Sequence, residues 1–203
     1  MKQAYRSRFA FVLGWVWVVF AALNVYDLIA RYNGKPALVA LAVLAALTAL
    51  VYVVALRPVT RFTEAALIGR NPLRTTAVPW ASVEDVSVSH SINVRHDAGE
   101  LLRLWTPVSS ARERAKAQRR GAAPPRRGRF RTEPALTKAE QAAAEALAGK
   151  THADWVGEQI TERAESARRR GQEAAPARVS WAYDSFAAIA VALVMVVVAV
   201  VAG

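Results

Sequence analysis

Residues 37–56 read ALVALAVLAALTALVYVVAL, an apolar run without a charged side chain, in which Thr48 and Tyr52 carry the polar groups. As a helix that rises about 1.5 Å per residue, a run of this length crosses a hydrocarbon core of about 30 Å. A helix buried in a soluble core rarely stays apolar on every face for so long. The run therefore predicts a membrane-spanning helix, around which the rest of the chain is arranged.

Two further apolar blocks lie on either side of a polar middle region: residues 9–25 (FAFVLGWVWVVFAALNV) and 186–202 (FAAIAVALVMVVVAVVA). The first is either an uncleaved anchor or a cleaved signal peptide. Its length, its Trp and Val content and the lack of an A-x-A-like site favour the anchor. The second is either a span or a buried soluble helix, and the near-absence of polar residues favours the span. The expected interfacial anchors are Trp15, Trp17, Tyr26, Trp181 and Tyr183.

The first two blocks are joined by a short polar turn at residues 27–36 (DLIARYNGKP), so they predict an antiparallel hairpin. The turn holds only Arg31 and Lys35, whereas more basic residues flank the two open ends of the hairpin: Lys2, Arg6, Arg8, Arg57 and Arg61. The positive-inside rule then places the N-terminus and residues 57–180 in the cytoplasm and the C-terminus outside. We expect a multi-pass protein of the cytoplasmic (inner) membrane.

Charge and hydrophobicity are separated along the chain. The sequence of 203 residues is 54% hydrophobic and yet carries a net charge of +11. Residues 57–180 hold 22 of the 27 Lys and Arg residues and 14 of the 16 Asp and Glu residues. The absence of cysteine excludes disulfide scaffolds, Cys-ligated zinc, iron–sulfur clusters and thiol catalysis.

The polar middle region changes character along its length. Residues 57–106 alternate loosely between apolar and polar side chains, which predicts four or five short strands in one strongly bent antiparallel sheet, with Trp80 in its core. Residues 107–134 are rich in Arg, Gly and Pro and indicate a mobile basic segment that opens with a short helix. Two helices are expected next, at 136–149 and 151–170, with caps at Thr137 with Glu140 and at Thr151 with Asp154.

These patterns predict a membrane α plus small β protein. Its segments are a basic N-terminus (1–8), a two-helix transmembrane hairpin (9–56), a β-domain (57–107), a basic mobile insertion (108–135), a helical segment (136–170), a linker (171–180) and a third, C-terminal transmembrane helix (181–203).

A membrane hairpin followed by RPVTR and then GRNPLRTTAVPWASVEDV resembles the membrane-anchored bacterial PH-like domain family of actinobacteria. The residues that carry the resemblance are Gly69 with the RNPLR motif at 70–74, then Pro79, Trp80, Val83 and Val86. The resemblance covers about residues 9–106 and implies a cytoplasmic PH-like antiparallel β-domain closed by a C-terminal helix, assigned to residues 151–170. The long basic insertion and the third span depart from the family pattern, so a simple monomeric lipid-reading role does not follow.

The candidate contact residues are all arginines. Each basic residue near an anionic leaflet contributes about 1 kcal/mol of attraction. Arg70 and Arg74 flank the Asn71-Pro72 turn, and a basic run extends over residues 112–131. For both, the alternative to ligand binding is an ordinary solvated surface. The expected contacts with anionic lipid or with a partner protein are Arg57, Arg61, Arg70, Arg74, Arg119, Arg120, Arg126, Arg127 and Arg129.

No stretch of the sequence indicates a reaction, so no cofactor, metal or catalytic residue is expected. His90 and His96 lie six residues apart, about 20 Å on a strand, which excludes joint metal ligation unless the strand bends sharply. Glu84 and Asp85 are neighbours and would point to opposite faces of a strand. Neither a nucleophile elbow nor a phosphate-binding glycine loop is present.

Three functional hypotheses remain. The first is a non-enzymatic interaction module at the inner face of the membrane, which binds a partner protein, anionic lipid or both. The second is an accessory subunit of a larger membrane complex, for example a respiratory assembly, in which the spans make the contact. The third, a nucleic-acid binder, is disfavoured because only Phe130 interleaves with the basic run, and no nucleic acid is expected as a partner.

Overall fold

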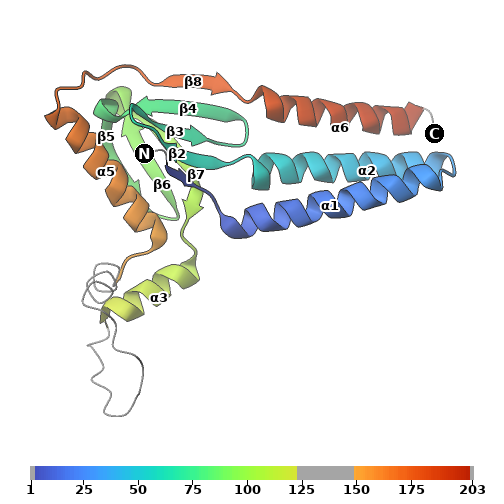
Figure 1. The fold of residues 1–203 in the computed structure, drawn as a ribbon, viewed down its shortest axis with the longest axis horizontal. Helices are drawn as coiled ribbons and strands as arrows, with labels where there is room; N and C mark the ends of the chain where they lie inside the picture. Colours follow the sequence, from blue (N-terminus) through green and yellow to red (C-terminus); the bar gives the residue numbers. More distant parts are fainter. Residues whose placement is uncertain (1–2, 123–148, 202–203) are drawn as a thin grey trace, which may run out of the picture.

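The computed structural model describes residues 3–122 and 149–201. Figure 1 shows an elongated molecule, with three long helices at one end and the strands and the remaining helices at the other. The N-terminal strand lies at the strand-rich end, while the turn between the first two long helices and the end of the third lie at the opposite end. The polar part of the described chain is therefore gathered at one end of the helices.

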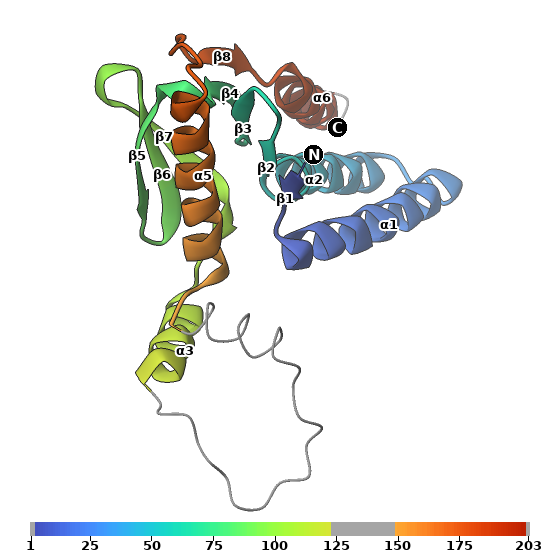
Figure 2. The ribbon, with the colours of Figure 1, turned by 60° about the vertical axis from the view of Figure 1, so that its left-hand side comes forward.

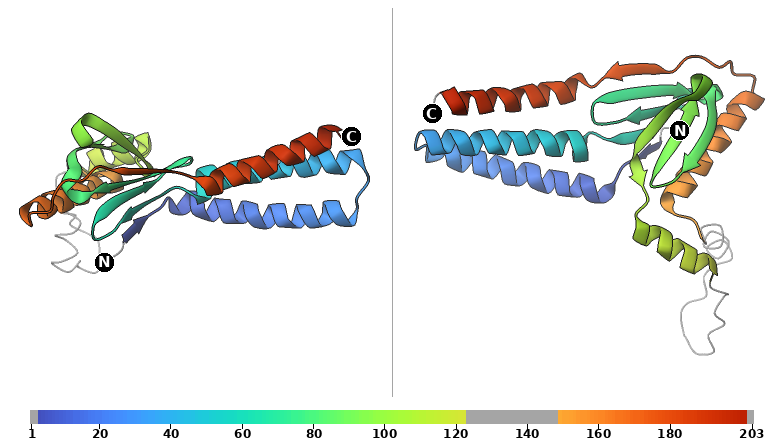
Figure 3. Two further views of the ribbon diagram at one scale, coloured as in Figure 1. Left: turned by 90° about the horizontal axis from the view of Figure 1, so that it is seen from above. Right: turned by 180° about the vertical axis from the view of Figure 1, so that it is seen from behind.

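The long helices correspond to the three apolar blocks. They are α1 (Arg8–Ala30), α2 (Lys35–Val51), which a π-helical turn extends to Leu56, and α6 (Tyr183–Val201). Within the described residues, these three are long and apolar enough to cross a membrane. Both α1 and α6 pack against α2, which lies between them (Figure 3). The predicted hairpin and third apolar helix are confirmed.

Five strands form the first sheet, in the order β1-β2-β3-β4-β8 with every pair antiparallel. They are β1 (Gln3–Tyr5), β2 (Val59–Phe62), β3 (Ala66–Arg70), β4 (Arg74–Pro79) and β8 (Arg178–Trp181). The two edge strands lie in segments predicted as a basic terminus and a linker. Such short strands lack a sequence signal of their own, and they pair because α1 and α6 bring them beside β2 and β4.

The remaining strands form a second sheet, in the order β5-β6-β7: β5 (Val83–Val88), β6 (Ser91–His96) and β7 (Glu100–Val108). The expectation of a single bent sheet is therefore wrong. Pro79 ends β4, and a 3₁₀ turn at Trp80–Ser82 redirects the chain into the second sheet. Proline cannot donate to a sheet ladder, which accounts for the break at this position.

The core lies between the two sheets and helix α5 (His152–Arg169), which crosses the second sheet in Figure 2. Trp80 is 2% exposed and its indole Nε1 donates to the carbonyl of Thr63 at 3.0 Å, which confirms its core position. The helix contributes apolar side chains at helical spacing: Ala153, Val156, Ile160, Ala164 and Ala167.

Helix α5 also confirms the predicted cap at its start. The Thr151 hydroxyl accepts from the Asp154 amide at 3.2 Å, and the Asp154 carboxylate accepts from the Thr151 amide at 2.8 Å. The helical opening of the basic segment is α3 (Ala111–Ala122). The expected helix at 136–149 and its cap at Thr137 lie outside the described residues.

Candidate functional site

The β3–β4 turn joins the first sheet to the third apolar helix. The hydroxyl of Ser185 donates to the carbonyl of Pro72 at 2.7 Å, and the Ala182 amide donates to the carbonyl of Leu73 at 3.0 Å. Figure 1 shows this turn beside the start of α6. The sheet is thus fixed to the ends of the helices by backbone and side-chain bonds.

Arg57 and Asp184 form an ion pair at this junction. Nε of Arg57 donates to both carboxylate oxygens of Asp184, at 3.1 and 3.0 Å, and the Tyr52 hydroxyl donates to Oδ2 at 3.0 Å. The other guanidinium nitrogens donate to the carbonyl of Asn71 and to Thr75 Oγ1. The Arg57 side chain is 2% exposed, so its donors are used inside the protein.

The side chain of Asn71 connects the two sheets. Its amide nitrogen donates to the carbonyl of Arg103 at 2.8 Å, and its amide oxygen accepts from the backbone amide of Trp105 at 3.1 Å. The same residue supplies the carbonyl that Arg57 binds. Asn71 therefore links the second sheet to the ion pair at the ends of the long helices.

A group of arginines surrounds the junction, and we call it the basic collar: Arg6, Arg8, Arg61, Arg70 and Arg74. Arg61 and Val59 lie two residues apart on β2 and so share a face, and Arg70 pairs directly with Val59. The opposite face of β2 carries the buried Phe62. Arg61 and Arg70 thus lie on the outer face of the first sheet, whereas Arg74 follows the alternation of β4 onto the opposite face, where it pairs with Trp181 of β8.

Arg6, Arg61 and Arg70, three cations of the collar, are close enough to repel one another. Partial burial lowers the pKa of the Arg6 guanidinium, and the like charges of Arg61 and Arg70 lower this pKa further. Arg70 lies 3.7 Å from the Asp184 carboxylate, which already pairs with Arg57. The collar therefore carries an excess of positive charge that an anion would relieve.

Arg74 and Trp181 form the part of the collar nearest to α6. The guanidinium carbon of Arg74 lies 4.6 Å from the centre of the indole ring, within the range of a cation–π contact. Trp181 is 53% exposed and precedes α6 by two residues. An exposed indole at the end of an apolar helix is typical of an interfacial anchor, as expected for this residue.

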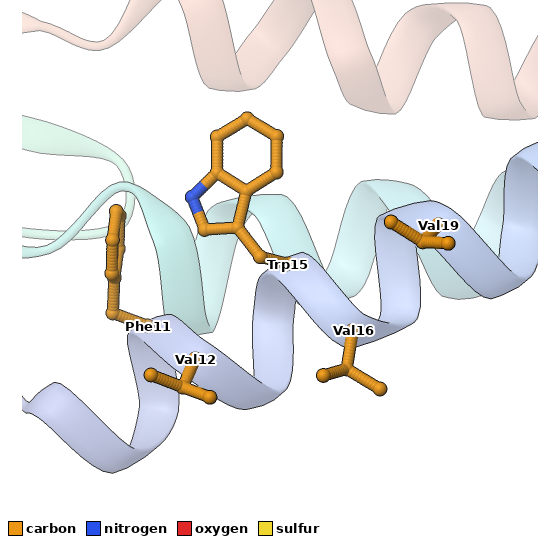
Figure 4. A pocket seen from close by; sticks show the side chains of 5 residues that line it. All are labelled: Phe11, Val12, Trp15, Val16 and Val19. Carbon is orange, nitrogen blue, oxygen red and sulfur yellow. The ribbon is translucent and has the colours of Figure 1, made fainter.

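An apolar hollow on α1 lies beside the collar, lined by Phe11, Val12, Trp15, Val16 and Val19 (Figure 4). The Phe11 and Trp15 rings lie 6.3 Å apart in an edge-to-face arrangement. The Arg6 guanidinium lies over the Phe11 ring at 4.8 Å. A cationic group and an apolar surface thus meet at the start of α1.

The predicted contact residues separate into four groups. Arg61, Arg70 and Arg74 belong to the collar, whereas Arg57 is in the interior and joins the helices to the sheet. Arg119 is exposed on α3, and Arg120 lies in the same helix. The last three, Arg126, Arg127 and Arg129, lie outside the described residues.

Sequence reasoning missed the partners of the buried arginine. Asp184, in the first turn of α6, supplies the carboxylate that binds Arg57 and Tyr52. A single acidic residue in the first turn of an otherwise uncharged apolar helix was the available signal. Trp17 is also less exposed than expected, because its indole donates to Thr48 Oγ1 of α2 at 3.2 Å.

The titratable residues weighed as catalytic candidates lie apart from this junction. A bulge between Val83 and Asp85 leaves the neighbours Glu84 and Asp85 both exposed, rather than on opposite faces. His90 precedes β6 and His96 ends it. Comparisons with models of protein families, with curated proteins and with solved structures found no match.

Proposed function

We propose that the protein is a non-enzymatic, membrane-anchored PH-like interaction module at the inner face of the cytoplasmic membrane. Its ligand is an anionic phospholipid, bound with its headgroup at the basic collar and an acyl chain along the hollow of α1. The observation that carries this proposal is the contact of Arg6 with Phe11, where the collar and the hollow meet.

The chemistry of the collar fits a phosphate group. Arginine presents planar donors that match phosphate oxygens, and each cation near an anionic leaflet contributes about 1 kcal/mol. Arg6, Arg61 and Arg70 raise each other's electrostatic energy as long as no anion lies between them. Arg57 is excluded from headgroup binding because its donors are used by Asp184, Asn71 and Thr75.

The distribution of charge supports a cytoplasmic domain. The collar lies at the domain end of the spans, whereas the opposite end carries Arg31 and Lys35. Of these two, Arg31 is paired with Asp27 at 3.0 Å. The excess of basic residues at the domain end is what the positive-inside rule associates with the cytoplasmic side.

The order of elements supports the PH-like assignment. A sheet that contains β2, β3 and β4 is followed by a second sheet of β5, β6 and β7 and then by α5, which packs on the core. Two residues of the recognised motif have structural roles in this arrangement: Asn71 links the sheets and Trp80 fills the core.

Lipid binding is tested with the full chain purified in detergent and titrated with phosphatidylglycerol or phosphatidylcholine, with thermal unfolding as the readout. The variant Arg6→Gln/Arg61→Gln removes two collar cations and spares Arg70, which contacts Asp184. At about 1 kcal/mol for each cation, the apparent affinity for phosphatidylglycerol should fall about 30-fold. Added salt should weaken the same interaction.

The matched control is Arg168→Gln/Arg170→Gln, which removes two exposed cations at the end of α5, far from the spans in Figure 1. This variant should bind phosphatidylglycerol as the unmodified protein does. Equal responses to the anionic and the neutral lipid, or an unchanged affinity in the collar variant, would contradict the proposal.

A second candidate function, that of an accessory subunit in a larger membrane complex, is favoured by an apolar groove among α1, α2 and α6. The groove has a volume of about 760 Å³, and seven of its 17 lining residues are alanines, among them Ala21, Ala22, Ala45, Ala49, Ala188 and Ala192. Small residues let a further helix approach closely in a membrane. A helix of a partner subunit is therefore its proposed occupant.

Extraction in a mild detergent, followed by sizing and mass spectrometry, tests this second function. The full chain should migrate in a large complex, and Ala188→Phe should release it by filling the groove. Val194→Phe is the control, because Val194 is 60% exposed on α6 and lies outside the groove. Migration of the unmodified protein at its own size would exclude the accessory role.

A further inference from the structure

The turn between β6 and β7 brings three potential metal ligands together. His96 ends β6, Asp97 begins the 3₁₀ turn Asp97–Gly99, and Glu100 begins β7. One ligand atom from each of the three residues lies within 4.8 Å of the other two. This spacing is compatible with a single ion bound by one nitrogen and two oxygens.

His96 has a buried ring nitrogen that lacks a hydrogen-bond partner. The residue is 2% exposed, and its Nδ1 is the single such atom among buried side-chain polar atoms in the described part of the chain. Buried polar groups are nearly always satisfied, and leaving one unpaired costs about 1–3 kcal/mol. The orphaned nitrogen therefore requires an explanation.

The position of the Asp97 carboxylate suggests why Nδ1 of His96 has no hydrogen-bond partner. Its Oδ2 lies 3.2 Å from Nδ1 of His96, but the pair does not form a hydrogen bond. Two ligands of one ion, each about 2.1 Å from it at angles of 90–110°, are themselves about 3.0–3.4 Å apart. The separation of the two atoms is the one expected for neighbours in a coordination sphere.

A backbone group from another part of the chain orients the same carboxylate. The Ala177 amide donates to Oδ2 of Asp97 at 2.6 Å. Two residues earlier, the Ala175 amide donates to Ser82 Oγ at 3.0 Å, and the Ser82 hydroxyl donates to the Ala175 carbonyl at 2.6 Å. The segment that leads from α5 to β8 is thus fixed against the turn, and it supplies the outer-shell bond that metal-binding carboxylates commonly have.

We propose that His96, Asp97 and Glu100 bind a divalent transition-metal ion of the zinc, cobalt or manganese type. Nδ1 of His96 and one oxygen from each carboxylate are the protein ligands, and water completes the sphere on the side where Glu100 is exposed. An imidazole ligand favours these ions over calcium and magnesium, which prefer sites made of oxygen alone. The bound ion joins the β6–β7 turn to the segment that enters the third span.

The experiment uses the full chain without an affinity tag, purified in detergent and stripped of metal with a chelator. Calorimetric titration with Zn²⁺, Co²⁺ and Mn²⁺ should show saturable binding of one ion per chain, accompanied by a higher melting temperature. Co²⁺ should also give visible absorption bands from its protein ligands. Ca²⁺ and Mg²⁺ at the same concentrations should produce neither effect.

Two variants locate the ion. Glu100→Gln changes an exposed side chain, so it leaves the fold intact and should weaken binding by about 100-fold or more. His96→Asn should abolish the Co²⁺ absorption bands, and if this variant does not fold, Glu100→Gln decides alone. His90→Gln, at an exposed position before the other end of β6, is the control and should bind as the unmodified protein does.

Absence of binding at millimolar ion concentrations would overturn the proposal. Binding that survives Glu100→Gln, or that is lost in His90→Gln, would place the ion elsewhere and would overturn it as well.

Discussion

Arg57 and Asp184 lie 127 positions apart in the sequence, and Nε of Arg57 donates a hydrogen bond to Oδ2 of Asp184 at 3.0 Å. Arg57 directly follows the second apolar helix with its π-helical turn, and Asp184 belongs to the first turn of the third. The Arg57 side chain is 2% exposed. A charge that is enclosed in this way is stable only when its counter-ion is in place. The pair therefore couples the folding of the β-domain to the placement of the third long helix.

Removing either partner should destabilise the protein, because the remaining charge is left enclosed without its counter-ion. We expect Asp184→Asn and Arg57→Gln to lower the free energy of unfolding by on the order of 2–4 kcal/mol. This is slightly less than the loss for a fully buried pair, because the Asp184 side chain is 34% exposed. Unfolding by SDS in mixed micelles, followed by tryptophan fluorescence, measures the change.

The control for this pair is Asp27→Asn, which breaks the exposed Asp27–Arg31 pair at the opposite end of the spans. Its cost should be below about 1 kcal/mol. Equal losses in Asp184→Asn and Asp27→Asn would contradict a structural role for the buried pair.

Replacing Asn71 by Ala should loosen the contact between the two sheets. The change removes the donor to the Arg103 carbonyl and the acceptor for the Trp105 amide. At about 1 kcal/mol for each hydrogen bond, the free energy of unfolding should fall by about 2 kcal/mol. Asn33→Ala, in the exposed turn between the first two spans, should leave it nearly unchanged. Hydrogen exchange at the Trp105 amide should accelerate in the first variant alone.

A methyl group at Gly157 should push α5 away from the second sheet. A Cβ at this position would lie 2.6 Å from Cγ2 of Val88. Overpacking costs about 1–3 kcal/mol, and the better helix propensity of Ala offsets about 1 kcal/mol. We therefore expect Gly157→Ala to lower stability by about 1 kcal/mol.

The second substitution Val88→Ala should restore the stability lost in Gly157→Ala, since it removes the methyl group that the new Cβ meets. The melting temperatures of the two single variants and the double variant measure this coupling. Additive losses would show that the helix and the strand are not in the contact described.

Tyr5 should contribute a loss of stability at alkaline pH. Burial raises the pKa of its hydroxyl above the usual value of about 10, although the nearby charge of Arg163 opposes the rise. The unfolded chain then loses this proton at a lower pH than the folded one. The stabilisation that Tyr5 gives the folded chain is therefore fully present below about pH 10, and it is lost as the pH rises through the pKa of Tyr5 in the folded chain.

Tyr5→Phe keeps the ring that packs edge-on against Phe62 and removes the titrating group. Between about pH 9 and pH 11, its melting temperature should fall less steeply than that of the unmodified protein. Parallel curves would show that Tyr5 titrates alike in the folded and unfolded chains.

The features predictable from sequence are those that a local pattern specifies. The uninterrupted apolar runs identify α1, α2 and α6, and the Thr151 and Asp154 cap locates the start of α5. Trp80 follows a proline in a β-rich stretch, and its size and apolarity place it in the core. Each of these signals is contained in fewer than about two dozen residues.

What the sequence did not predict depends on contacts between distant segments. β1 and β8 are three and four residues long and pair only because the long helices hold them beside the sheet. The side-chain partners of Arg57 are Asp184 of α6, Asn71 of the β3–β4 turn and Thr75 of β4, so its burial has no local signature. His96, Asp97 and Glu100 are close in the sequence, but their meeting depends on the turn between β6 and β7, which the spacing alone does not specify.

The outermost strand β8 pairs with β4 across a wide gap in the sequence, since Ser180 and Thr75 are 105 residues apart. During synthesis, β4 emerges long before β8 and retains an open edge until residues 178–181 have been made. An open edge invites pairing with other chains. Pairing of β8 with β4 therefore ends a period of vulnerability to aggregation, and a chain that stops before residue 178 would carry that open edge permanently.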